Sequence, residues 1–261
     1  MLAPMGTTDH KDSTVSFGFT EVAEDAKAGL VRGVFDRVAG RYDLMNDVMS
    51  AGVHRLWKQV MIDWLDPQPG QRLIDVAGGT GDVAQTFLDR AEKKARRRGA
   101  PHASAIVCDI NPAMLEAGTK RRVRGDLAFL AGDAERLPLA DQVADACTIA
   151  FGIRNVTHID RALAEMRRVL KPGGRFLCLE FSHVVVAGLD TLYNTYSFRV
   201  IPRLGELIAG DEPAYRYLVE SIRRFPDQVS FAKMIESAGF GRVSYRNLSG
   251  GIAALHSGWR I

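Results

Sequence analysis

The residues with the clearest potential for chemistry form a glycine-rich segment, Asp75-Val76-Ala77-Gly78-Gly79-Thr80-Gly81-Asp82. An apolar run precedes it and an amphipathic run follows, which predicts a loop between a strand and a helix. Glycines there let the backbone approach a ligand closely, and the amino terminus of the helix attracts anionic groups. The plain alternative is a tight turn that binds nothing. The dinucleotide pattern GxGxxG is absent, because the glycines fall at positions 78, 79 and 81.

Polar or small residues also follow the next three predicted strands. Asp109 ends the second strand, where a carboxylate can accept both hydroxyl groups of a ribose, or it caps the next helix, a role that Asn111 could also fill. Asp133-Ala134 follows the third strand, where an acid can meet an adenine amino group, or it serves only a turn. Phe151-Gly152 follows the fourth strand, beside the place expected for a bound cofactor.

These residues need a sheet that brings the strand ends together. Apolar strands are predicted at Arg72–Val76, Ala105–Cys108, Leu127–Ala131, Ala144–Ala150 and Arg175–Phe181, with helices at Asp82–Arg98, Pro112–Lys120, Asp160–Leu170 and Asp227–Ala238. This alternation predicts a parallel sheet covered on both faces, with the strand carboxyl ends along one functional edge. Two further strands, at Val243–Asn247 and Ile252–His256, are joined by the hairpin signal Ser249-Gly250-Gly251. The outline matches the α/β, Rossmann-like sheet of class I methyltransferases, with seven strands of which one is antiparallel.

The expected organisation is a single methyltransferase domain at 25–261 behind a flexible N-terminal tail at 1–24. Residues 25–66 are expected to form a helical lid. The alternation breaks at 183–226, an aromatic segment that is interpreted as a helical insertion covering the substrate.

The glycine segment resembles the D/E-x-G-x-G-x-G motif of S-adenosylmethionine (SAM) methyltransferases, with Ala77 in the first glycine slot. Because four strand ends carry suitable residues, SAM is favoured over NAD as the cofactor. An NAD dehydrogenase is the weaker alternative, which competing titrations of SAM and NAD would test.

Longer motifs indicate which family of SAM methyltransferases the chain resembles. The segments are YDLMNDVMS at 42–50, followed by His54 and Trp57; RVLKPGGRFLCLEFS at 168–182; AGGTGD at 77–82; FGIRNV at 151–156; and YRYLVESI at 215–222. With them the chain resembles the UbiE-type ubiquinone/menaquinone biosynthesis C-methyltransferases from about Phe17 to Trp259. One departure is Ala150, where many members have Ser, so a hydroxyl contact to the cofactor is missing there.

The resemblance implies transfer of a methyl group from SAM to a ring carbon of a polyprenylated quinol. The substrate would be a 2-polyprenyl-6-methoxy-1,4-benzoquinol, a demethylmenaquinol or both. The residues expected to bind the cofactor are Thr80, Asp109, Asp133, Ala134, Gly79, Gly81, Asp75 and Tyr42. Two alternatives remain at this point: methylation of another small apolar acceptor, and a non-catalytic SAM-binding subunit of a quinone-biosynthetic assembly.

Ring methylation needs the neighbouring hydroxyl to lose its proton, and a phenol titrates near pH 10. Arg154 and Asn155 are predicted to activate the substrate. Arg154 would stabilise a phenolate, and Asn155 would orient a hydroxyl group. The alternative for Arg154 is a salt bridge that anchors the loop. His54 is the second candidate base, unless it is structural. Tyr196, Arg199 and Tyr217 of the insertion either line the quinol pocket or pack in the core. No histidine spacing indicates a metal site.

Composition limits the partners. The net charge is +3, no apolar run is long enough to span a bilayer, and the three cysteines have no CxxC spacing, which together predict a cytoplasmic protein that does not coat nucleic acid. A substrate with a prenyl tail still suggests peripheral attachment to the inner face of the cell membrane. The basic run at 93–98 could attract anionic lipid, although such a run is more often a solvated helix face. A homodimer or a place in a quinone-biosynthesis assembly is left open.

Overall fold

The computed structural model describes residues 14–38, 47, 50, 52–121, 123–186, 188 and 212–261. Strands and helices alternate through its middle, as predicted. The central strands are β3 (Arg72–Val76), β4 (Ser104–Asp109), β5 (Asp126–Ala131), β6 (Ala144–Ala150) and β7 (Leu170–Phe181). The helices between them are α4 (Asp82–Arg98), α5 (Pro112–Thr119) and α6 (Ile159–Val169), and a short 3₁₀ turn, Ile153–Asn155, follows β6.

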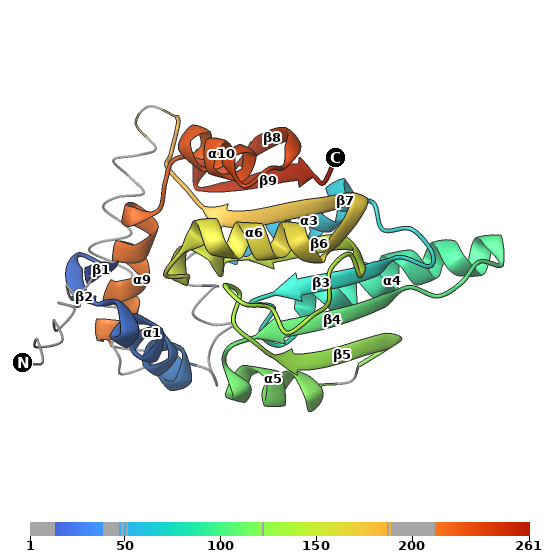
Figure 1. The fold of residues 1–261 in the computed structure, drawn as a ribbon, viewed down its shortest axis with the longest axis horizontal. Coiled ribbons are helices and arrows are strands. Elements are labelled where there is room, and N and C mark those ends of the chain that lie inside the picture. Colours follow the sequence, from blue (N-terminus) through green and yellow to red (C-terminus); the bar gives the residue numbers. More distant parts are fainter. Residues whose placement is uncertain are drawn as a thin grey trace, which may run out of the picture.

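Within the described chain these strands belong to a seven-stranded sheet in the order β5-β4-β3-β6-β7-β9-β8 (Figure 1). β8 (Gly241–Leu248) and β9 (Ala253–Trp259) form the terminal hairpin, and β9 runs antiparallel to both of its neighbours. The other neighbouring pairs are parallel, so their carboxyl ends reach one edge. The predicted class I methyltransferase sheet, with one reversed strand, is confirmed.

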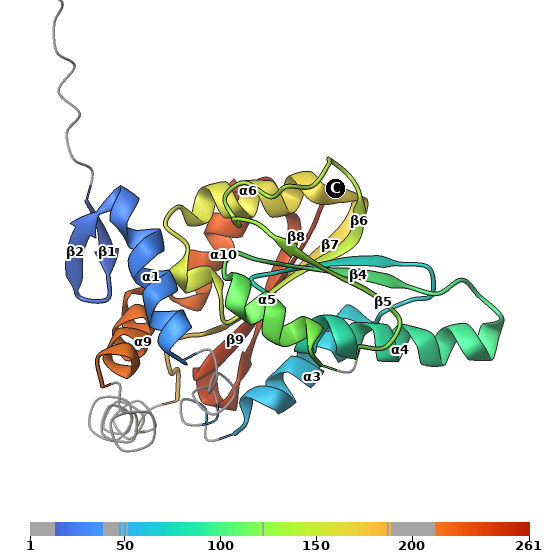
Figure 2. The ribbon, with the colours of Figure 1, turned by 90° about the horizontal axis from the view of Figure 1, so that it is seen from below.

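Helices cover both faces of the sheet because its strands are apolar on both sides. α3 (His54–Leu65) and α4 lie against one face, and α6 and α10 (Gln228–Ser237) lie against the other (Figure 2). Each layer has its own buried apolar cluster, one with Trp57, Met61 and Phe87 and the other with Met166, Phe176 and Phe231. This packing holds the strand ends in fixed positions.

The N-terminal region differs from the prediction. Part of the expected flexible tail is a hairpin, β1 (Thr14–Phe17) paired with β2 (Thr20–Ala23), so that interpretation is wrong for 14–23. The alternation of Val15, Phe17 and Val22 with polar residues is a strand signal. The hairpin is too short to be stable alone, and it packs beside α1 (Glu24–Val38) and α9 (Glu212–Arg224) at one end of the molecule (Figures 1 and 2).

The strand predicted at Arg175–Phe181 starts earlier in the structure, because β7 begins at Leu170 and includes Lys171–Gly174. Two pairings extend this strand: Leu170 pairs with Ala144 of β6, and Arg260 exchanges backbone hydrogen bonds with Gly173 and Gly174, at 2.7 and 2.9 Å. In the part of the chain that the structure describes, no helix is long and apolar enough to cross a membrane.

Candidate active site

The glycine-rich loop joins β3 to α4 in a strained conformation. Ala77, Gly79 and Gly81 all have positive φ angles, of 49°, 56° and 84°. Ala77 is the residue that departs from the glycine motif, and it adopts the left-handed backbone at a cost of about 1 kcal/mol. Gly79 lies against a pocket, where a Cβ atom would come within 3.0 Å of the Met114 methyl group. Its missing side chain keeps that wall of the pocket open.

Asp109 lies beside this loop and is held by backbone amides. Its Oδ2 accepts from the Gly79 amide and its Oδ1 accepts from the Asn111 amide, both at 2.8 Å. Burial raises the pKa of Asp109, while the Asn111 and Gly79 amides act in the opposite direction. Asn111 caps α5 through its side chain, so Asp109 is not needed as the cap. The Ile110 amide contributes as well, so three backbone amides hold the carboxylate and only part of its acceptor capacity is left for a ligand.

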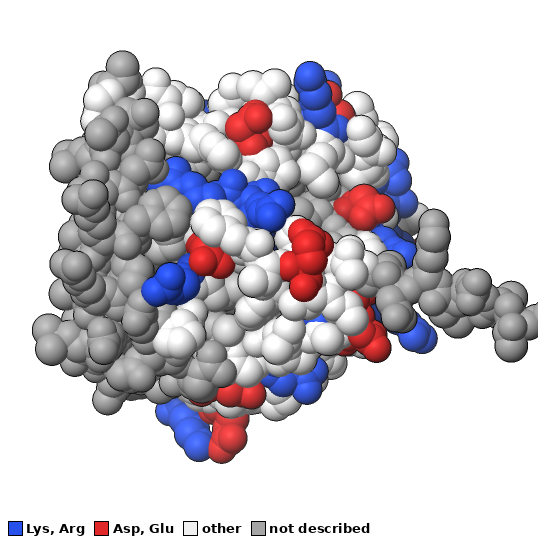
Figure 3. All heavy atoms as spheres, turned by 90° about the vertical axis from the view of Figure 1, so that its left-hand side faces the viewer, with Lys and Arg blue, Asp and Glu red and all other residues white. Residues whose placement is uncertain are grey.

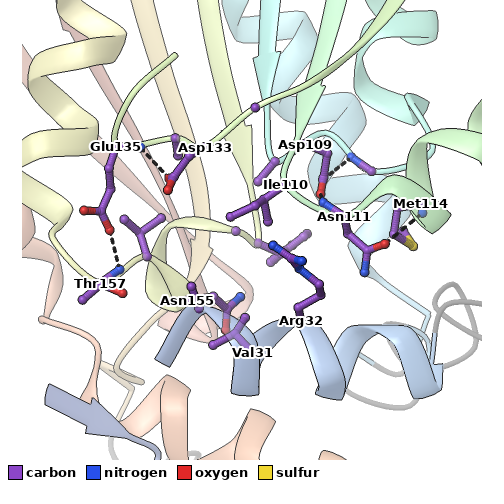
Figure 4. A pocket seen from close by; sticks show the side chains of 18 residues that line it. Val31, Arg32, Asp109, Ile110, Asn111, Met114, Asp133, Glu135, Asn155 and Thr157 are labelled. Atoms are coloured by element: carbon purple, nitrogen blue, oxygen red, sulfur yellow. Dashed lines mark hydrogen bonds between the residues drawn. The ribbon is translucent and has the colours of Figure 1, made fainter. Parts of the chain in front are cut away.

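A pocket lies between the ends of β3 to β6 and α1 (Figure 4). The predicted residues that line it are Gly79, Asp109, Asp133, Ala134 and Asn155. The lining residues that the sequence analysis missed include Ala28, Val31 and Arg32 of α1, together with Ile110, Met114, Glu135 and Thr157. The signal for Ile110 in the sequence is its position directly after Asp109, whereas its exposure is seen only in the structure. The contribution of α1 depends on how that helix docks, which its own periodicity does not specify.

Asp133 makes a turn and also lines the pocket, so its turn role is present, while its contact with an adenine amino group stays a prediction. Its Oδ1 accepts from the Glu135 amide at 2.9 Å. Glu135 Oε1 in turn accepts from the Thr157 and His158 amides at 3.0 and 2.9 Å. The loop after β5 therefore holds the loop that follows β6, and both loops line the pocket.

Three of the predicted cofactor residues, Asp75, Thr80 and Gly81, do not line this pocket. Asp75 lies buried under the glycine-rich loop, where it accepts from the Thr148 hydroxyl at 2.7 Å. Burial raises the pKa of Asp75 to about 7. Gly81 is the N-cap of α4. Tyr42 lies outside the described residues, as do Tyr196 and Arg199.

Arg154 is buried and paired. One guanidinium nitrogen donates to Glu180 Oε1 at 2.7 Å and to the Phe151 carbonyl at 2.6 Å. Both charged side chains are 2% exposed, and Arg154 does not line the pocket. The anchoring role considered for Arg154 is thus present in the structure, whereas its contact with a substrate stays a prediction.

Asn155 does line the pocket, and Tyr217 of α9 contacts it. The Tyr217 hydroxyl donates to Asn155 Oδ1 at 3.1 Å. Burial raises the pKa of Tyr217 to about 12, so this hydroxyl remains a donor at neutral pH. The amide group of Asn155 is left to donate through Nδ2.

His54 begins α3, away from the pocket lining. Its Nε2 lies 3.0 Å from Asp47 Oδ1, and its Nδ1 is buried without a hydrogen-bond partner. Burial lowers the pKa of His54, with a further contribution from Lys58. A neutral imidazole could accept a proton, but His54 is not among the residues that line the pocket at the strand ends. Its role as a base stays a prediction.

A profile of the ubiE/COQ5 methyltransferase family matches residues 14–260. The chain belongs to the ubiE/COQ5 methyltransferase family. It is 58% identical to the ubiquinone/menaquinone biosynthesis C-methyltransferase UbiE of Caulobacter vibrioides, over 96% of this chain and 99% of that one. It is also 58% identical to the UbiE protein of Paracoccus denitrificans, over 97% of this chain and 100% of that one.

A solved SAM-dependent methyltransferase of Thermotoga maritima shares the fold, with a TM-score of 0.58 and 20% identity over 88% of this chain and 100% of that one. Family membership makes the chain a SAM-dependent C-methyltransferase, as its motifs predicted. The pocket lining fits this cofactor. Three carboxylates line the pocket, Asp109, Asp133 and Glu135, and they can bind the hydroxyl, amino and cationic groups of SAM. Among the described lining residues, Arg32 is the cation that could bind the carboxylate of SAM.

Proposed function

We propose that the chain transfers a methyl group from SAM to a ring carbon of a polyprenylated quinol. The substrate is a 2-polyprenyl-6-methoxy-1,4-benzoquinol, a demethylmenaquinol or both. The observation that carries this proposal is the identity of 58% with UbiE proteins over nearly the whole chain. The pocket at the strand ends supports it, because carboxylates and the amide of Asn155 meet there.

In this proposal each carboxylate binds a different part of the cofactor. Asp109 accepts the ribose hydroxyls through its remaining lone pairs, because the Gly79 and Asn111 amides already fix its orientation. Asp133 accepts from the adenine amino group. Thr80, Gly81 and Asp75 act by holding the loop in shape, and Gly79 gives the cofactor close access to the backbone. The bound cofactor supplies an electrophilic methyl group.

The protein must then favour the ionised form of the acceptor hydroxyl. Asn155 is proposed to donate an Nδ2–H bond to that oxygen after the hydroxyl proton has passed to water, which stabilises the phenolate. Its ring carbon then bonds to the methyl carbon as the carbon–sulfur bond breaks, and the ring proton also leaves to water. Arg154 contributes by fixing the turn that carries Asn155, because Glu180 already neutralises its charge. Ala28, Val31 and Arg32 of α1 line the pocket opposite the strand ends, so α1 limits the access of water to the two reactants.

A substrate with a prenyl tail lies in the membrane, so the protein must contact the membrane surface. We propose that it does so at the end of the molecule that carries α1 and α9. The basic run at the end of α4 lies at the opposite end of the sheet (Figure 1). Figure 3 shows basic and acidic side chains interspersed on the α1 end. One apolar side chain there, Leu30 of α1, is 41% exposed. Flotation with anionic vesicles, compared between Leu30→Ser and Lys93→Ser, would separate the two attachment sites.

Incubation of the purified protein with SAM and a demethyl quinol tests the reaction. The expected products are S-adenosylhomocysteine and a quinol that carries one more ring methyl group, identified by mass spectrometry. A panel of phenols and sterols is run in parallel. Methylation of a sterol with no turnover of either quinol class would refute the proposed substrate and favour another apolar acceptor. A deletion strain that accumulates the demethylated quinone would identify the quinol class used in the cell.

A non-catalytic role is tested by Asn155→Ala in the same strain. If this variant restored quinone synthesis fully while showing no methyl transfer in vitro, a structural subunit would be the better reading. Self-association or membership of an assembly is a separate proposal, which analytical ultracentrifugation and affinity capture of the tagged protein would address.

A further inference from the structure

The N-terminal hairpin contacts the insertion helix α9 through an aromatic stack. The rings of Phe17 and Tyr217 lie 4.2 Å apart between centroids, at an interplanar angle of 19°. A second contact holds the hairpin turn, where the Phe19 amide donates to Glu220 Oε2 at 3.0 Å. About 200 residues separate the partners in sequence, so this is a tertiary contact and not a local turn.

Tyr217 continues the contact toward the pocket. It is 5% exposed, and its ring is covered on one side by Phe17. Its hydroxyl reaches Asn155 Oδ1 at 3.1 Å. A continuous path of contacts therefore runs from β1, through α9, to an amide that lines the pocket.

The segment 14–38 holds the same loop at a second point. Lys27 of α1 is 7% exposed, and its ammonium group donates to the Val156 carbonyl at 3.2 Å, directly after Asn155. Burial lowers the pKa of Lys27, while the carboxylates of Glu135 and Glu21 raise it. The loop after β6 is thus fixed by the N-terminal segment on one side and by Glu135 on the other.

We propose that Phe17 is a positioning residue for methyl transfer, acting through Tyr217 on the orientation of Asn155. The stack restricts the Tyr217 ring, and the hydroxyl of that ring fixes which end of the Asn155 amide faces the pocket. This inference rests on the proposed function, in which Asn155 contacts the acceptor hydroxyl. The hairpin is then part of the catalytic architecture and not only a cover for the fold.

A matched pair of variants separates positioning from packing. Phe17→Ala removes the stacked ring, whereas Phe19→Ala removes a half-exposed ring of the same hairpin. We expect Phe17→Ala to lower kcat/KM for the quinol roughly tenfold, because small displacements of aligned groups carry large rate penalties. We expect Phe19→Ala to stay within about twofold of the unaltered protein. Both are measured at saturating SAM and at a temperature where circular dichroism shows each variant folded.

The decisive measurement is the double variant with Asn155→Ala. If Phe17 acts through Asn155, Phe17→Ala has no further effect on kcat/KM once Asn155 is removed. Additive losses, or equal rates for the Phe17→Ala and Phe19→Ala variants, would overturn the inference. A loss of thermal stability alone would not support it.

Two milder variants keep the test informative if Phe17→Ala folds poorly. Phe17→Tyr retains a ring that can stack and should keep the full rate, whereas Phe17→Leu retains bulk without a ring and should lose rate. Full activity of Phe17→Leu would overturn the inference. If the unaltered protein itself turned over no quinol, the proposed function would fail, and this result would be seen before any variant is compared.

Discussion

Gly79→Ala tests whether the glycine-rich loop forms the cofactor site. The substitution places a Cβ atom 3.0 Å from the Met114 methyl group and 4.0 Å from Asp109 Oδ2, and both residues line the pocket. It also forces a residue with a side chain to adopt a φ angle of 56°. Gly99 is a matched control, because its φ angle is 60° and a Cβ atom there would meet nothing within 4 Å.

The two variants separate backbone strain from obstruction of the pocket. Each should lose about 1 kcal/mol of the free energy of unfolding from the left-handed backbone alone. Only Gly79→Ala should also weaken SAM binding, by about 1–3 kcal/mol for an added methyl group in a close-packed site. That range is roughly a 5- to 150-fold rise in Kd.

Isothermal titration with SAM measures the Kd, and urea unfolding measures the stability of each variant. An unchanged Kd for Gly79→Ala, or an equal rise for Gly99→Ala, would refute the placement of the cofactor against this loop. A Kd that rises only for Gly79→Ala, with similar losses of stability in both, is the expected result.

Three other substitutions test the surroundings of the pocket. Glu180→Gln leaves the buried Arg154 charge without its partner and should lower the free energy of unfolding by about 3 kcal/mol, measured by urea unfolding; a loss below about 1 kcal/mol would contradict this. Asn111→Ala removes the cap of α5 and should cost about 1 kcal/mol, with hydrogen exchange showing whether the loss is confined to that helix. Asp75→Asn tests a pH dependence, because burial raises the folded-state pKa of Asp75 to about 7. The contribution of Asp75 to stability is therefore full below its unfolded-state pKa of about 4, and it is lost as the pH rises to 7. The variant should therefore gain stability relative to the unaltered protein between pH 4.5 and 7.5, and a difference that does not vary with pH would count against the raised pKa.

Most of the sheet was predictable because each strand is a short apolar run with turn-forming or polar residues on both sides. The bounds of β3, α4 and β6 coincide with the predicted ranges. Local sequence sets the ends of these elements: Gly81 is the N-cap of α4, and Gly99 is its C-cap. The start of β7 was not predictable, because it depends on tertiary pairing of Leu170 with Ala144 and of Gly173 and Gly174 with Arg260 at the other end of the chain.

The candidate site was predictable where it follows strand ends and unpredictable where it depends on docking. Asp109 and Asp133 were found because parallel topology places consecutive strand ends together. Arg32 and Val31 were missed, because a helical pattern shows which residues share a face but not which surface that face covers. Phe17 was assigned to a tail for the same reason: its partner, Tyr217, lies about 200 residues away in the sequence.

The buried ion pair of Arg154 and Glu180 has a consequence for the turn after β6. Phe151 has a φ angle of 58°, a conformation that is costly for a bulky residue. Its carbonyl accepts from Arg154 and its amide donates to the Leu179 carbonyl at 2.8 Å, so both sides of the strained residue are held. A buried ion pair is a weak source of stability, since desolvation offsets much of its attraction. Its better-supported effect here is to hold one conformation of the turn, which keeps Phe151 in the pocket wall and Asn155 beside it.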